Sequence, residues 1–104
     1  MEVRTAASPR DVKHYTTDRL REEFLIQDLF QADKINLVYS HIDRIITGAA
    51  VPAKETLTLT AGAELRAEYF LQRREMGIIN IGGAGTITVD GKAYEVAYKE
   101  GMYI

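Results

Sequence analysis

The sequence predicts a mainly β protein, an antiparallel β-sandwich or barrel that follows a short helical lead-in. Two β-branched, apolar runs, 78–81 and 86–89, flank the glycine-rich turn 82–85. A second turn, Asp90-Gly91, comes directly after them, and Asp-Gly is among the strongest short hairpin signals. Seven or eight such short runs recur at nearly regular spacing, which is the pattern of sandwiches and barrels.

Size and composition are those of one globular domain. The chain has 104 residues, of which 46% are hydrophobic and 27% are charged, and its net charge is −2. This composition excludes a disordered chain, and no basic patch suggests nucleic acid. The absence of Cys excludes disulfides and thiolate metal sites. Because no run resembles a signal peptide or a membrane span, we expect a soluble, cytoplasmic protein with no nucleic-acid or membrane partner.

The lead-in combines an arm with two short helices. Residues 1–7 read as an extended arm, and Ser8 is the N-cap of a helix that has Pro9 in its first turn and continues for one or two turns over 11–15. Thr16 provides a second N-cap, and the run 19–24 has two apolar residues four positions apart, as an amphipathic helix requires. We therefore divide the single domain 1–104 into an arm with short helices at 1–30 and sandwich strands at 31–104.

The expected strands follow the lead-in. In chain order they cover 25–30, 35–39, 41–47, 56–60, 67–81, 86–89 and 94–98. The first could also extend the preceding helix, but a strand is favoured. The run 56–60 alternates perfectly, which places Leu57 and Leu59 on one face. The runs 78–81 and 86–89 are expected to pair within a meander of at least three antiparallel strands. Because residues 101–104 open a strand without a closing turn, we expect a piece of a longer protein.

The glycine run Gly82-Gly83-Ala84-Gly85 could also indicate dinucleotide binding. The fingerprint requires a third glycine, but Thr88 stands at that position. It also requires a helix to follow, whereas this run is followed by a strand former. The hairpin interpretation is therefore favoured.

Polar residues suited to chemistry are concentrated at two places. In the first, His41 and Asp43 share one strand face if Ile42 points to the core, which permits a catalytic pair, although a solvated face is favoured. In the second, Arg73 and Arg74 could bind an anion, although a salt-bridged strand is favoured. The only histidines, His14 and His41, lie far apart, so the residues indicate no metal site.

Part of the chain resembles the first motif of the cupin superfamily. The spacing Glu75-x6-Gly82 and the run GAGTITVDGKAYEV match the second half of that motif, and residues 99–104 look like the opening of the next motif. The histidine pair of the motif falls on Glu68 and Phe70 or on Tyr69 and Leu71, so its metal ligands are missing. The resemblance implies a cupin-like jelly-roll sandwich, half of a bicupin.

Three blocks resemble one family, the 5-dehydro-4-deoxy-D-glucuronate isomerases. The blocks are LREEFL (20–25), YSHIDR (39–44) and the long run 69–91, in the order found in the N-terminal part of that family. The resemblance implies an aldose–ketose isomerase of pectin and uronate breakdown that converts 5-dehydro-4-deoxy-D-glucuronate to 3-deoxy-D-glycero-2,5-hexodiulosonate. It further implies zinc, held by residues C-terminal to Ile104, and a homohexamer.

Two functions remain open from the sequence. In the first, the chain is the N-terminal portion of the isomerase and is inactive by itself. A uronate carboxylate would suit an arginine, which makes Arg44, Arg73 and Arg74 candidates. In the second, the chain is a stand-alone degenerate cupin that binds a sugar acid or serves in assembly. The sequence beyond Ile104 would separate the two.

Overall fold

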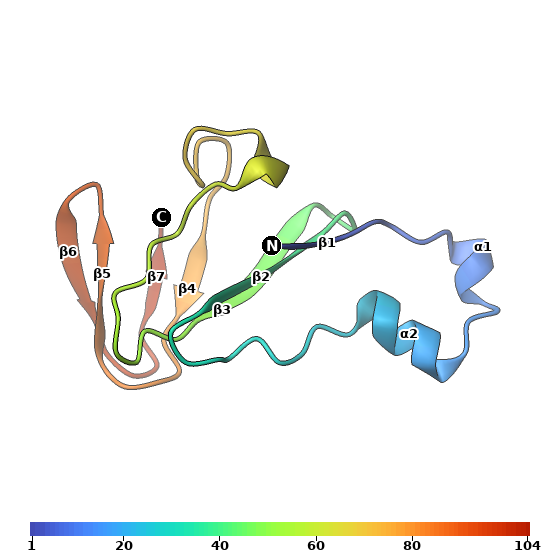
Figure 1. Ribbon diagram of the computed structural model, residues 1–104, viewed down its shortest axis with the longest axis horizontal. Helices are drawn as coiled ribbons and strands as arrows, with labels where there is room; N and C mark the ends of the chain where they lie inside the picture. Colours follow the sequence, from blue (N-terminus) through green and yellow to red (C-terminus); the bar gives the residue numbers. More distant parts are fainter.

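The computed structural model describes residues 1–104 and contains three small sheets and short helices (Figure 1). In chain order the elements are β1 (Glu2–Arg4), α1 (Pro9–Val12), α2 (Thr17–Phe24), β2 (Ile35–Ser40), β3 (Ile45–Ala50), the 3-10 helix η1 (Ala63–Leu65), β4 (Gly77–Ile79), β5 (Gly85–Val89), β6 (Lys92–Val96) and β7 (Gly101–Tyr103). The sheets have the orders β1-β2-β3, β4-β7 and β5-β6. The mainly β class with a helical lead-in is confirmed, but a closed sandwich or barrel is not shown.

The largest sheet is built on the β2–β3 hairpin. These two strands pair antiparallel over six residues each, from Ile35 opposite Ala50 to Ser40 opposite Ile45. Strand β1 adds to the other edge of β2 in parallel. The extended arm expected at 1–7 is therefore partly a strand. The sequence does not indicate this pairing, because parallel strands are joined by a long connection and the partner of β1 lies far along the chain.

Both helices begin where their caps predict. The Ser8 side chain accepts a hydrogen bond from the backbone N–H of Arg10, and Thr16 accepts one from that of Arg19. These bonds satisfy backbone donors that have no partner inside the helix. The first helix begins at Pro9, directly after its predicted N-cap. Neither helix has the length and apolar character that a bilayer crossing requires.

Several expected strands do not form. Residues 25–30 and 56–60 are irregular, 41–44 form the turn before β3, and most of 67–81 is turn and loop before the short β4. The burial of 56–60 still alternates as predicted, with Leu57 and Leu59 less exposed than the threonines. The predicted strand is wrong, because a strand requires a hydrogen-bonded partner and none of the sheets includes this segment.

The expected meander is also replaced by a different pairing. Strand β4 pairs with β7 and not with β5, so the glycine-rich segment 82–85 joins two separate sheets. Asn80 fixes this connection, since its side-chain amide donates to the carbonyls of Gly83 and Val96, at 2.9 Å each. The β5–β6 hairpin itself is confirmed. Its turn residues Asp90 and Gly91 both have positive φ, as tight hairpins require.

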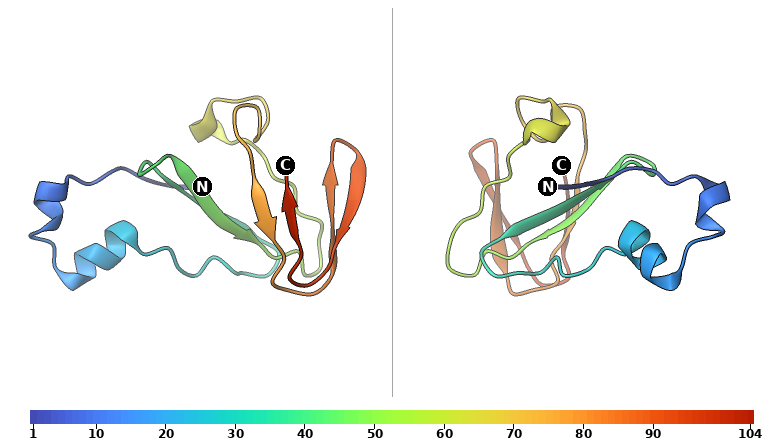
Figure 2. Two further views of the ribbon diagram at one scale, coloured as in Figure 1. Left: turned by 180° about the vertical axis from the view of Figure 1, so that it is seen from behind. Right: turned by 45° about the vertical axis from the view of Figure 1, so that its right-hand side comes forward.

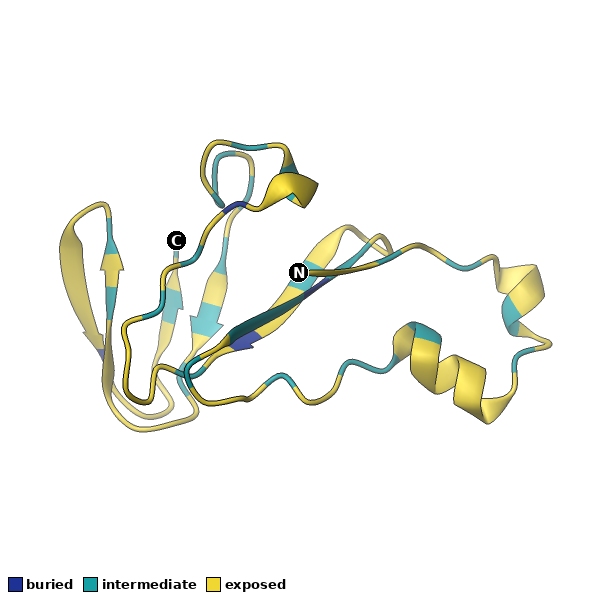
Figure 3. Ribbon diagram, in the orientation of Figure 1, coloured by how far each residue is buried: buried dark blue, intermediate teal, exposed yellow.

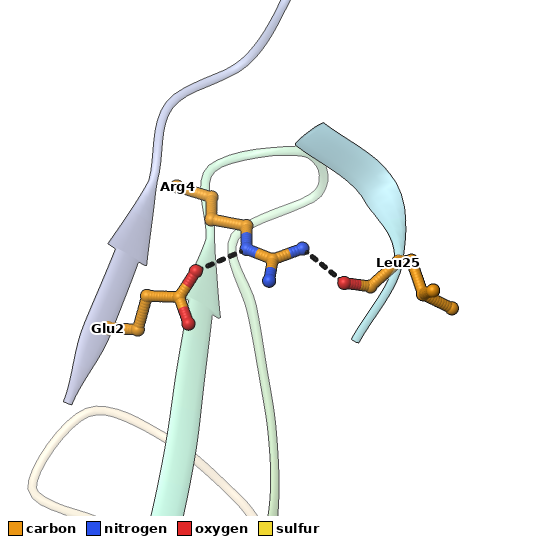
Figure 4. Close-up of polar contacts among 3 residues, drawn as sticks. All are labelled: Glu2, Arg4 and Leu25. Carbon is orange, nitrogen blue, oxygen red and sulfur yellow. Dashed lines mark hydrogen bonds and ion pairs between the residues drawn. The ribbon is translucent and has the colours of Figure 1, made fainter. Parts of the chain in front are cut away.

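Arg4 ties strand β1 to the end of helix α2 (Figure 4). Its Nε donates to the Glu2 carboxylate at 2.6 Å, and its Nη1 donates to the carbonyl oxygen of Leu25 at 2.7 Å. Leu25 is the C-cap of α2, where backbone carbonyls lack helical partners. The arginine thus links residues 21 positions apart and connects the lead-in to the sheet.

Asp33 organises the segment that follows β3. One of its carboxylate oxygens accepts the backbone N–H groups of Ala53, Lys54 and Glu55 at 2.7–3.1 Å. The bond from Lys54, followed by those from Glu55 and Ala53, holds the pKa of Asp33 below its ordinary value. Hydrogen bonds to the charged form have this effect. The carboxylate thus orients residues 53–55 where they leave the sheet.

Burial is sparse throughout the structure (Figure 3). Only Val38, Ala49, Ala61 and Val96 are buried. The structure extends over 48 × 29 × 21 Å, with the helices at one end and the β5–β6 hairpin at the other (Figures 1 and 2). Its radius of gyration is 15.8 Å, whereas a compact domain of this length has about 13 Å. The apolar strands therefore share no single core.

Candidate functional site

An arginine-lined hollow lies between the β2–β3 turn and the loops that precede β4. Its volume is about 350 Å³, which falls within the range of small-molecule sites. Seven residues line it: Asp43, Arg44, Leu65, Ala67, Phe70, Arg73 and Arg74. Three arginines and one aspartate therefore line the hollow together with three apolar residues. Four of the five residues predicted from the sequence meet here, although they come from segments about 30 positions apart.

Arg74 holds the two sides of the hollow together. Its Nη2 donates to the hydroxyl of Tyr39 at 2.9 Å, and its Nη1 donates to the carbonyl oxygen of Arg44 at 3.1 Å. Its guanidinium also lies 4.8 Å from the centre of the Tyr39 ring, within the range of a cation–π contact. The side chain is consequently held in one orientation. The predicted salt-bridged strand is not found here, because Arg74 binds neutral partners and forms no ion pair.

Tyr39 is the residue of this cluster that the sequence analysis did not single out. It lies near the end of β2, and its ring contacts that of His41, with 4.9 Å between the ring centres. The guanidinium of Arg44, and then that of Arg74, hold the pKa of Tyr39 below its ordinary value. Only Arg74 meets hydrogen-bond geometry with the hydroxyl. The available signal was that Tyr39 begins the motif YSHIDR, which contains the candidates His41, Asp43 and Arg44.

The turn at 41–44 determines where the candidates His41, Asp43 and Arg44 lie. Asp43 and Arg44 both have a left-handed backbone, each with φ of 55°. This conformation is uncommon for residues other than glycine, asparagine and aspartate. The expected strand at 41–47 begins only at Ile45, so His41 and Asp43 do not share a strand face. Instead the turn directs Asp43 and Arg44 to the hollow, while His41 lies against Tyr39 outside its lining.

The residues of this chain do not fit a metal ion. No group of three or more His, Cys, Asp or Glu side chains converges in the structure. The two histidines lie in separate turns, one between the helices and one after β2. A zinc site needs three or four such ligands in a tetrahedral arrangement. The chemistry available in the hollow is therefore anion binding and hydrogen bonding.

We predict that Tyr39 ionises at a lower pH than an unperturbed tyrosine. The Arg44 and Arg74 guanidiniums favour its phenolate, whereas a hydrogen bond to the Glu75 carboxylate raises the pKa of Tyr103. Because the folded pKa of Tyr39 lies below the unfolded value, its ionisation stabilises the fold above the unfolded pKa. This contribution is lost as the pH falls through the folded pKa. Phenolate absorbance during an alkaline titration measures the order, with Tyr39 first and Tyr103 last.

Two variants assign the early phase of that titration. Tyr39→Phe should remove it, and Arg74→Gln should shift it to higher pH. An early phase that survives Tyr39→Phe would contradict the role given to the two arginines.

Comparison with known proteins shows what the chain is similar to. It is 79% identical over all 104 residues to the 4-deoxy-L-threo-5-hexosulose-uronate ketol-isomerase of Lachnoclostridium phytofermentans. Over its whole length the chain matches one part of this ketol-isomerase. Ketol-isomerases of the same name from Lachnospira eligens and Formosa agariphila are 60% and 54% identical, over 100% and 99% of this chain. No family model matches the chain.

The ketol-isomerase relatives are much longer than this chain. The matched region makes up 38% of the first relative and 37% of each of the other two. The family that the three sequence blocks resemble is confirmed, since the ketol-isomerase name describes the same uronate isomerisation. The hollow thus lies in a chain that is similar to one part of these ketol-isomerases.

Proposed function

We propose that the complete protein containing these residues is a ketol-isomerase of uronate and pectin breakdown. It interconverts 5-dehydro-4-deoxy-D-glucuronate and 3-deoxy-D-glycero-2,5-hexodiulosonate. The observation that supports this proposal is the 79% identity to a named ketol-isomerase over every residue of the chain. A match of this extent leaves no part of the chain to be explained by another family.

Ketol isomerisation requires two chemical roles, which different parts of such a protein can provide. The reaction moves a proton between adjacent carbons, so it needs a base and a group that polarises the carbonyl. A zinc ion supplies polarisation of this kind when it is bound. Because the present chain has no convergent metal ligands, we place the zinc ligands C-terminal to Ile104. Residues 1–104 then contribute scaffold and one wall of the substrate site.

Further parts of the proposal concern the complete protein. We propose that the small sheets join strands from the rest of the protein to form a bicupin sandwich. Residues 1–104 would then be its N-terminal cupin-like domain, with the lead-in at 1–30 and sandwich strands at 31–104. The complete protein would assemble as a homohexamer and work in the cytoplasm.

Metal content and turnover test the proposal directly. We expect the complete protein to bind zinc and to isomerise the uronate, whereas residues 1–104 expressed alone should do neither. Zinc is measured by elemental analysis of the purified proteins, and turnover is followed by NMR of the sugar. One equivalent of zinc in the 104-residue chain would contradict the proposal. A complete protein without turnover would support instead a sugar-acid-binding or assembly module.

A further inference from the structure

The three arginines of the hollow have no anionic partner within the chain. Ion pairs occur at Arg4–Glu2 and Arg19–Glu23, and neither lies at the hollow. Asp43 lines the same hollow, but its carboxylate is not within ion-pair distance of any arginine. Guanidiniums held close together repel one another unless an anion lies between them. The cluster is thus unneutralised although carboxylates are plentiful elsewhere in the sequence.

Arg73 is the arginine of the hollow whose guanidinium N–H donors have no partner. Arg74 is committed to Tyr39 and to the backbone of Arg44. The Arg73 side chain makes no hydrogen bond and no ion pair, yet it lines the hollow beside Arg74. Its neighbour is fixed in orientation, so an anion would meet a partly preorganised site. A guanidinium with free donors is suited to a carboxylate, which it binds with two parallel hydrogen bonds.

The remaining lining suits a sugar ring. Phe70 and Leu65 add apolar surface to the lining, and the volume of about 350 Å³ accommodates a monosaccharide. The Tyr39 hydroxyl does not line the hollow, but it accepts a hydrogen bond from Arg74 and so helps to fix that side chain. A ligand with a planar carboxylate at one end and a ring at the other would therefore satisfy both kinds of lining.

We propose that this hollow binds the carboxylate of a hexuronate, with Arg73 as the principal donor and Arg44 and Arg74 beside it. The choice of a uronate rests on the proposed function, because the ketol-isomerase relatives are named for a uronate substrate. The anion site itself rests on the geometry of the chain alone. Arg74 is also a positioning residue, since it holds Tyr39 and the turn at Arg44.

Binding to the complete protein tests the site without requiring turnover. The probes are D-glucuronate and D-glucuronamide, which share a ring but differ in charge, with inorganic phosphate as a third arm, measured by calorimetry. We expect the acid to bind more tightly than the amide by about tenfold to a hundredfold, the effect of one charge-assisted hydrogen bond. Arg73→Gln should remove most of that difference. In turnover, it should raise KM for the uronate more than it lowers kcat.

Arg66→Gln is the matched control. It removes one positive charge from the same loop, but Arg66 does not line the hollow, so affinity and KM should stay at the wild-type values. Melting temperatures of both variants verify folding. Equal binding of acid and amide, equal effects of the two variants, or phosphate binding as tight as glucuronate would each overturn the proposal. If the complete protein binds the acid more tightly than the amide but shows no turnover, the proposed anion site stands and the proposed isomerase function is wrong.

Discussion

Replacing Gly48 by alanine is expected to lower the free energy of unfolding of the complete protein by about 1–3 kcal/mol, the usual cost of overpacking. Gly48 lies opposite Leu37 in the β2–β3 hairpin. An added Cβ would lie 2.5 Å from the carbonyl oxygen of Asn36 and would also collide with the Leu37 side chain. The leucine could change rotamer, but the carbonyl belongs to the backbone of the paired strand. The hairpin must therefore shift to admit one methyl group.

Denaturant unfolding of the complete protein measures this effect. Gly85→Ala is the matched control, because Gly85 is also a strand glycine but has no atom within 4 Å of the added methyl. Its effect should be close to zero or slightly stabilising, since alanine restricts the unfolded chain. Equal stabilities of the two variants would show that the hairpin accommodates a side chain at position 48.

The second large effect concerns residues 1–104 expressed alone. We expect this chain to bind the dye ANS strongly and to unfold without a cooperative transition. Large apolar side chains are exposed on several elements, and three of the most exposed are Ile79 at 74%, Tyr103 at 72% and Phe30 at 65%. With four buried residues in the whole chain, few side chains contribute to shared packing. Cooperative unfolding depends on burial that many residues share.

The complete protein provides the comparison. If the rest of the protein covers these strands, it should bind little ANS and unfold in a sharp transition. Fluorescence with the dye and circular dichroism during heating provide the two readings. A 104-residue chain that excludes ANS and melts sharply would show that the small sheets hold together without further partners.

Part of the candidate site was readable from the sequence. The resemblance implies a uronate carboxylate, for which Arg44, Arg73 and Arg74 are the predicted partners, and the structure brings all three to one hollow. Tyr39 was missed, because nothing in a local pattern shows that a residue 35 positions away will donate to its hydroxyl. The predicted catalytic pair of His41 and Asp43 required both residues to lie on one face of a strand. Residues 41–44 form a turn instead, so this requirement is not met.

Local chemistry determined the features that depend on neighbours along the chain. Ser8 and Thr16 cap the helices as predicted, and Asp90-Gly91 forms the β5–β6 turn. Each involves residues only a few positions apart, so the sequence contains all of the interacting groups. The family could likewise be inferred from three ordered blocks.

Only the tertiary structure decided the pairings between distant segments. Strand β4 pairs with β7, and β1 joins β2 in parallel, although the sequence predicts that the run 78–81 pairs with its neighbour 86–89. The run 56–60 keeps its alternating faces without becoming a strand. The physical reason is that alternation specifies which side of a strand is apolar, whereas strand formation also requires hydrogen bonds to a backbone that lies elsewhere in the chain.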